Sequence, residues 1–135
     1  MDAGSKLREL LPHEKGDTER AEAIVALGYP AVAPILPDLI EWLQDCNWPV
    51  AHVLSPFLAQ IGLPLLPPVR AVLATNDYQW KYWVLLRLVE PSPDLVFALH
   101  DEITRLAVHP TAAEILEELD YVAQEILDGA AGKTA

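Results

Sequence analysis

The chain has 135 residues, 52% of them hydrophobic, and its 20 acidic and 9 basic residues give a formal net charge of −11. This length predicts one domain with a core of its own, and the hydrophobic content excludes a chain that is disordered throughout. The acidic balance excludes the basic surface that nucleic-acid-binding proteins need, so we expect no nucleic-acid partner.

Helix starts recur at regular intervals along the chain. Asp17, Asn47 and Asp77 follow one another at intervals of 30 residues, and each precedes a run with a helical spacing of apolar residues. Asp and Asn favour such positions because their side chains accept hydrogen bonds from the first free N–H groups of a helix. Repeats of about this length are typical of stacked helix pairs.

A second match places residues 27–30 (Leu-Gly-Tyr-Pro) against residues 61–64 (Ile-Gly-Leu-Pro) at an offset of 34. The match continues through Pro34 and Pro68 into the next helix of each pair. The glycine in each string is expected to end a helix, because glycine adopts the left-handed backbone that follows many helices.

In chain order, residues 1–16 are expected to form a lid over the first helix pair, because a stacked array needs an atypical end. Seven helices are expected to follow, over residues 17–27, 34–45, 47–61, 64–75, 77–88, 92–108 and 111–128. The last of them begins with a capping box of Thr111 and Glu114. Its exposed acidic face is expected to carry Glu114, Glu117, Glu118, Glu125 and Asp128. Residues 129–135 are expected to be a flexible tail.

Alternating β-branched runs with hairpin turns are absent from the sequence, so the predicted fold class is all-α. Counting the lid, we expect about seven or eight helices. The helical repeat is predicted to form a single domain over residues 17–128.

The most distinctive strings are residues 47–51 (Asn-Trp-Pro-Val-Ala) and 80–83 (Trp-Lys-Tyr-Trp), and residues 19–34 and 41–45 accompany them. Together they resemble a bacterial family of HEAT-like helical domains of unknown function, over roughly residues 10–110. The resemblance implies a short α-α superhelix of HEAT-like stacked helix pairs. It implies no reaction, and the acidic final helix lies outside it.

The predicted binding surface is aromatic. The 30-residue interval gives Trp48 and Tyr78 the same place in successive units, so they should meet at one edge of the stack. Large aromatic side chains beside polar groups are frequent anchors of protein interfaces. The predicted partner-binding residues are Asn47, Trp48, Asp77, Tyr78, Trp80 and Lys81. The competing interpretation is that the rings fill the core and that Lys81 pairs locally with Asp77.

No pattern in the sequence indicates catalysis, a metal or another cofactor. The four histidines are scattered, the single cysteine, Cys46, has no cationic neighbour in sequence, and no HExxH, CxxC or glycine-rich phosphate loop occurs. Ser55 precedes Pro56 inside a helix, where a backbone carbonyl is its expected partner. We therefore predict no catalytic residue, no metal site and no cofactor.

The predicted location is the cytoplasm, without a membrane partner. A lone cysteine fits a reducing compartment, and no apolar run reaches the roughly 20 residues that span a bilayer. The first residues also lack the apolar region of a secretion signal.

The sequence thus predicts a non-catalytic, HEAT-like module that binds another protein. One alternative is an acidic protein of the immunity or antitoxin type that neutralises a basic effector, favoured by the ten acidic residues from Glu90 to Asp128. Another is a small-ligand enzyme that uses a concave groove, which would need converging side chains with shifted pKa values.

Overall fold

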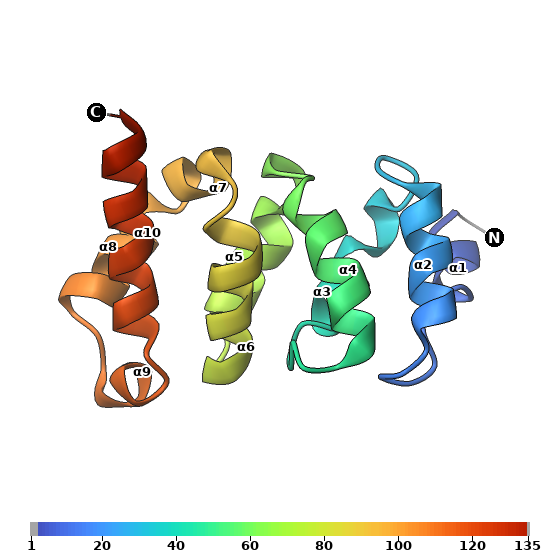
Figure 1. Ribbon diagram of the computed structural model, residues 1–135, viewed down its shortest axis with the longest axis horizontal. Helices are drawn as coiled ribbons and strands as arrows, with labels where there is room; N and C mark the ends of the chain where they lie inside the picture. Colours follow the sequence, from blue (N-terminus) through green and yellow to red (C-terminus); the bar gives the residue numbers. More distant parts are fainter. Residues whose placement is uncertain (1–2, 135) are drawn as a thin grey trace.

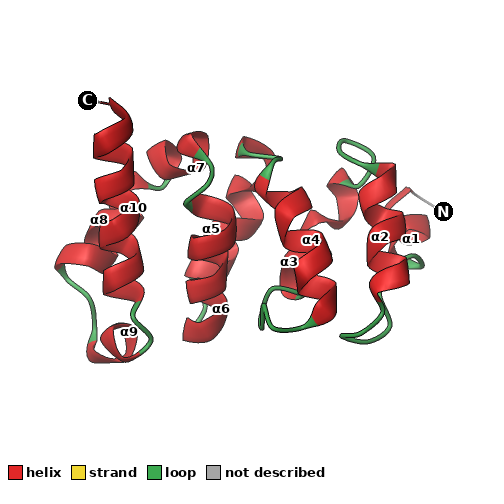
Figure 2. Cartoon of the chain, viewed as in Figure 1, coloured by secondary structure: helices red, strands yellow, loops and turns green. Residues whose placement is uncertain are grey.

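The computed structural model describes residues 3–134 of the chain, and within that range it contains helices and loops and no strand (Figures 1 and 2). The α-helices are α1 (Ala3–Arg8), α2 (Thr18–Leu27), α3 (Leu36–Glu41), α4 (Pro49–Ala59), α5 (Leu66–Leu73), α6 (Tyr78–Val84), α7 (Pro93–Ala98), α8 (His100–Val108), α9 (Ala112–Leu116) and α10 (Leu119–Thr134). Two 3-10 helices, η1 (Ala33–Ile35) and η2 (Leu63–Leu65), lead into α3 and α5, and a π-helical turn, η3 (Leu85–Val89), continues α6. The predicted all-α fold class is confirmed for this range.

The helices outnumber the seven or eight that the sequence predicts, because several expected helices are divided. Leu99 separates α7 from α8, with φ −102° and ψ 13°. Glu118 separates α9 from α10, and its φ of 60° lies in the left-handed region, which interrupts a right-handed helix. Apolar spacing continues across both breaks, so the sequence pattern does not reveal them.

The elements follow one another in chain order along the long axis, from the N-terminal end to the C-terminal end (Figure 1). Helix α2 packs against α4, α4 against η3, and α8 against α10, so neighbouring hairpins in the chain are also neighbours in space. Helix α1 packs against η1, where the sequence predicts a lid. The fold is therefore a row of helix pairs.

The 30-residue repeat extends to the second helices, and the offset of 34 is wrong there. Helices η1 and η2 begin at residues 33 and 63, and α3 and α5 at residues 36 and 66. In this register Ile35 and Leu65 are equivalent, and both are fully buried. Residues 29–32 separate Gly28 from η1, whereas Gly62 directly precedes η2, and this longer first loop displaces the two glycines.

Asp17 and Asp77 cap α2 and α6, as predicted. The carboxylates accept hydrogen bonds from the backbone N–H groups of Arg20 (3.4 Å) and Trp80 (3.1 Å), respectively. Each contact satisfies one N–H group that has no partner within its own helix.

Asn47 does not cap α4, and that prediction is wrong. The N-cap position belongs to Trp48, whose side chain makes no capping hydrogen bond. The backbone N–H of Val50 instead donates to the carbonyl of Lys15, in the loop before α2, at 3.0 Å. This bond between hairpins satisfies a free N–H group at the start of α4, and so it replaces a side-chain cap.

A continuous hydrophobic core joins the hairpins. The fully buried large side chains come from nearly every helix pair; they are Ile24, Ile35, Leu39, Ile40, Leu43, Leu54, Leu58, Leu65, Leu85, Leu88, Leu95 and Leu99. Burial of one such side chain contributes about 1.5 to 3 kcal/mol, so the core, rather than helix propensity, holds these short helices in place.

The C-terminal end of the row differs from the sequence prediction. Helix α10 runs to Thr134, where a flexible tail is expected from residue 129. It packs against α8 and also contacts α7, and the break at Leu99 gives α7 a direction different from that of α8 (Figure 1). The second half of α10 and helices α7 and α8 line a hollow between them.

Candidate functional site

Trp80 belongs to the packing between hairpins. Its indole Nε1–H donates a hydrogen bond of 3.0 Å to the backbone carbonyl of Ile40, and the side chain is half-buried. The ring also borders a shallow hollow beside Pro68 and Thr75. This bond ties α6 to α3, which is a structural use of the residue.

Trp48 lies on the other side of α3. Its ring meets that of Trp42 edge to face, with 6.0 Å between the centroids and 72° between the planes. Both tryptophans line a hollow together with Leu11 and Pro12. Glu41 lines this hollow and also the hollow beside Trp80. The structure thus brings Trp48 and Trp80 to the two sides of Glu41, both half-buried.

Lys81 is buried, with 6% of its surface exposed, so it cannot lie on an exposed binding surface. Its Nζ lies 4.9 Å from the centroid of the Tyr78 ring, and within residues 3–134 it forms no ion pair with Asp77. Burial lowers the pKa of Lys81, whereas the carboxylate of Glu114 opposes that shift. Its burial contradicts a role on an exposed surface, and a contact with the Tyr78 ring stands in place of the expected pair with Asp77.

Of the other predicted binding residues, Asn47 and Asp77 are exposed and Tyr78 is half-buried. Asp77 serves as the cap of α6, and the Asn47 N–H donates to Asp45 Oδ1 at 2.8 Å. The six predicted residues therefore do not form one exposed aromatic surface.

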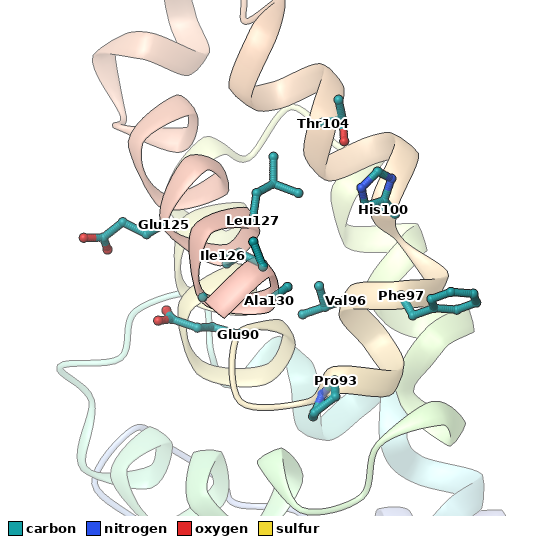
Figure 3. Close-up of a pocket in the computed structure, with 12 residues that line it drawn as sticks. Glu90, Pro93, Val96, Phe97, His100, Thr104, Glu125, Ile126, Leu127 and Ala130 are labelled. Atoms are coloured by element: carbon teal, nitrogen blue, oxygen red, sulfur yellow. The ribbon is translucent and has the colours of Figure 1, made fainter. Parts of the chain in front are cut away.

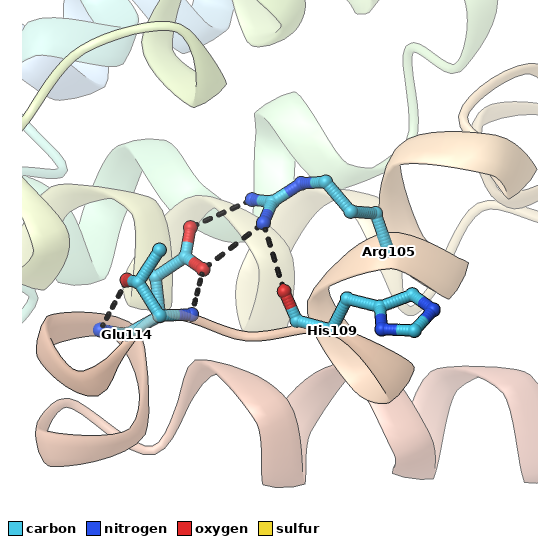
Figure 4. Close-up of polar contacts among 4 residues, drawn as sticks. Arg105, His109 and Glu114 are labelled. Carbon is cyan, nitrogen blue, oxygen red and sulfur yellow. Dashed lines mark hydrogen bonds and ion pairs between the residues drawn. The ribbon is translucent and has the colours of Figure 1, made fainter.

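Glu114 holds the last hairpin to α8 (Figure 4). Its carboxylate receives Arg105 Nη2 at 2.7 Å and Nη1 at 3.1 Å, and it is 4% exposed. The predicted capping box is confirmed: Thr111 N–H donates to Glu114 Oε1 at 2.8 Å, and Glu114 N–H donates to Thr111 Oγ1 at 3.2 Å. Arg105 also donates to the carbonyl of His109 at 3.3 Å.

The hydrogen bonds from Arg105, more than any other contact, lower the pKa of Glu114 to about 2. Burial opposes this shift, and the bonds from Thr111 support it. The sequence predicts Glu114 on the exposed acidic face of the last helix, and its burial shows that this prediction is wrong. The residue is a buried structural acid, which leaves Glu117 and Glu118 as the exposed acids of this region.

The hollow between α7, α8 and α10 is an apolar groove of about 740 Å³ (Figure 3). Both walls are helical and largely apolar: one consists of Pro93, Val96, Phe97, His100 and Thr104, and the other of Ile126, Leu127, Gly129, Ala130 and Ala131. Phe97 is 86% exposed, which is unusual for so large an apolar side chain. This groove, open at the end of the row, is the candidate functional site.

The charged side chains at the groove are acidic. Glu90 and Glu125 line it, and their carboxylates lie at its edge, on the side of α10 away from Val96, Phe97 and His100 (Figure 3). Asp94 and Asp128 follow lining residues in sequence and are exposed. No Lys or Arg lines the groove in the described part of the chain, so its electrostatic potential attracts cations.

The groove holds no activated hydroxyl. His100 and Thr104 lie one helical turn apart, but Thr104 Oγ1 is buried and makes no hydrogen bond. A hydroxyl nucleophile needs an adjacent base within hydrogen-bonding reach. Cys46 lies elsewhere, and burial raises the pKa of its thiol to about 11, which keeps it protonated at neutral pH.

Sequence reasoning missed the groove because it assigned one wall to a tail. Ala130 and Ala131 continue the helical spacing of Ile126 and Leu127, and this spacing was a signal that the helix extends beyond residue 129. Phe97 lies off the buried stripe of Leu95, Val96 and Leu99, so its exposure agrees with helical spacing.

Comparison with known proteins identifies the family of the chain. No helix among residues 3–134 has the length and apolar character needed to cross a bilayer. No curated protein sequence matches the chain. A family model described as a domain of unknown function, DUF5071, matches residues 10–127. Since this match spans most of the sequence, the chain belongs to the DUF5071 family of domains of unknown function.

Proposed function

We propose that the chain is a non-catalytic, HEAT-like module that binds another protein through the groove between α7, α8 and α10. The observation that carries this proposal is the groove itself, an open apolar hollow of about 740 Å³ with Phe97 exposed at its rim. Exposed apolar patches rimmed by polar residues mark sites of protein interaction. An apolar groove between helices can accept a segment of another protein.

The groove supports this function better than the aromatic residues between Trp48 and Lys81 do. Trp80 is tied to Ile40, Trp48 packs against Trp42, and Lys81 is buried. These side chains already have partners within the chain. Phe97 is exposed, and the hollow beside it has room for a partner's side chains.

The walls of the groove also favour binding over catalysis. Most lining side chains are aliphatic, and Thr104 is not paired with His100 as a nucleophile would be. Cys46, a buried free thiol, agrees with the cytoplasmic location proposed for the protein.

Capture of binding proteins from the native host tests the proposal, with the groove filled in one variant. Ala130→Trp places an indole between the walls, and Ala23→Trp, on the exposed face of α2, is the matched control. We expect proteins retained by the unmodified chain and by Ala23→Trp to be lost from Ala130→Trp, with equal helical content in all three. Equal capture by Ala130→Trp would remove the groove as the binding site.

A second candidate function is neutralisation of a basic effector protein. It is favoured by the exposed acids around the C-terminal hairpin, among them Glu117, Glu118 and Glu125. Replacing these three by Gln should slow association with such an effector and weaken the salt dependence of the rate. An unchanged association rate would exclude this version.

A further inference from the structure

We propose that the groove holds an amphipathic helix of a partner protein, with Lys or Arg residues beside the apolar face of that helix. This inference rests on the proposed function, which it makes more specific. It commits to a helix as the occupant and to positive charge as the feature that selects it.

The shape of the groove argues for a helix. Pro93, Val96 and Phe97 have the spacing i, i+3 and i+4 on α7, and His100 and Thr104 lie one turn apart at the start of α8. Residues 126, 127, 130 and 131 form a second stripe on α10. Two such stripes form grooves into which the ridge of a third helix packs. An extended strand would need free backbone groups at a sheet edge, and the described residues contain no sheet.

The charge around the groove argues for a basic occupant. Glu90 and Glu125 line one side, and Asp94 and Asp128 lie next to lining residues. The arginines around this end of the row already have partners. Arg87 lies over the Trp83 ring at 5.6 Å, and Arg105 binds Glu114. Arg70 donates to the carbonyl of Ala98 at 3.3 Å and pairs with Glu102 at 3.5 Å. The acidic rim is therefore left for charges that a partner supplies.

The same charges argue against a second copy of the chain. Two copies that pair through this groove would bring their glutamates together, and each copy carries a net charge of −11. Like charges opposed across an interface destabilise it. A basic helix gains apolar burial against Val96 and Ile126 and attraction to the rim at the same time.

Designed peptides test this inference directly. The probes are three labelled helical peptides of about five turns with one shared Leu/Phe stripe, flanked by Lys, by Gln or by Glu, and their affinities for the full chain are measured by fluorescence anisotropy. We expect the Lys-flanked peptide to bind at least about tenfold more tightly than the Glu-flanked one, with a difference that shrinks as salt rises. The double variant Glu90→Gln/Glu125→Gln should lose most of that preference.

Control variants identify the surface responsible. Glu14→Gln/Glu22→Gln removes two exposed acids far along the row and should leave the preference intact. Phe97→Ala should weaken the binding of all three peptides. Leu116 is 82% exposed and lies outside the groove, so Leu116→Ala should leave their binding unchanged.

Each other outcome overturns a distinct statement. If the three peptides bind equally and Ala130→Trp abolishes the binding of all three, the groove binds helices without charge selection, and only the inference fails. If no peptide binds but Ala130→Trp still abolishes capture from the host, the occupant is not a basic helix, and the proposed function survives. Concentration-dependent dimerisation that Phe97→Ala removes would assign the groove to a second copy. If neither peptides nor capture respond to Ala130→Trp, both proposals fail.

Discussion

Glu114 combines burial, at 4% exposure, with three hydrogen bonds to its carboxylate, two from Arg105 and one from Thr111. The lowered pKa means that the ionised carboxylate of Glu114 is more stable in the folded chain than in the unfolded chain. This contribution to stability is fully present above the ordinary pKa of 4.5 and is lost as the pH falls towards about 2.

We predict that Glu114→Gln lowers the free energy of unfolding by about 2 kcal/mol at pH 7. The shift alone would give about 3 kcal/mol, but Arg105 is half exposed and water screens the pair. The difference in the free energy of unfolding between the variant and the unmodified chain should be about half as large at pH 3 as at pH 6. Urea unfolding at both values measures it, with exposed Glu117→Gln as the control. An equal difference at both pH values would contradict the assignment.

Trp80 and Trp48 allow a second comparison between single residues. Both are half-buried, but only Trp80 has a hydrogen bond from its indole N–H, to the carbonyl of Ile40. We predict that Trp80→Phe destabilises the chain by about 1 kcal/mol more than Trp48→Phe, which is the typical net contribution of such a bond. Thermal unfolding of the two variants side by side measures the difference, and equal losses would show that the bond contributes nothing.

Among the elements, the first turns of the helices follow most directly from the sequence. Asp17, Asp77 and Thr111 cap helices because a side-chain oxygen next to a helical run has a local partner to bind. Asn47 does not cap α4, because the carbonyl of Lys15, which is distant in sequence, accepts the hydrogen bond from the Val50 N–H at the start of α4. Local chemistry is thus predictable, and a cap replaced by a tertiary bond is not.

Breaks between elements were harder to predict. Glu118 adopts φ 60° although glutamate has no preference for this region, so the packing of α9 and α10 imposes it. Leu99 separates α7 from α8 while remaining fully buried, and apolar spacing runs through it. Periodicity reports which face is buried and is silent about a bend between two helices that share that face.

The positive φ of Glu118 predicts the effect of a glycine at this position. Glu118→Gly should stabilise the chain by about 0.5 to 1 kcal/mol, because glycine adopts a positive φ without strain. Glu117, with φ −96°, is the matched control, and Glu117→Gly should lower stability instead. Melting temperatures of both variants test this pair, and a lower value for Glu118→Gly would contradict it.

For the whole molecule, the order of helix pairs was predictable, whereas the position of the site was not. The 30-residue interval between Asp17, Asn47 and Asp77 predicts a row of like units, and the described helices follow one another in chain order along the long axis (Figure 1). The sequence placed binding at Trp48 and Trp80 because aromatic residues are frequent interface anchors. In the folded chain these rings have internal partners, and the open surface lies where α7 and α10 diverge.

A groove of this kind arises from the angle between helices, so no single string of residues encodes it. Pro93 to Thr104 and Ile126 to Ala131 each read as ordinary apolar stripes. Only the bend at Leu99 and the length of α10 leave the two stripes without a covering helix. The proposed function therefore requires that this end of the row is the binding surface.

Amide chemical-shift mapping tests that claim most directly. The isotopically labelled chain is titrated with the Lys-flanked peptide, and every backbone N–H is followed. We predict that the perturbed signals cluster on α7, α8 and the second half of α10, around Val96, Thr104 and Ala130. Perturbations centred on Trp48 and Trp80, with the groove unchanged, would contradict the account.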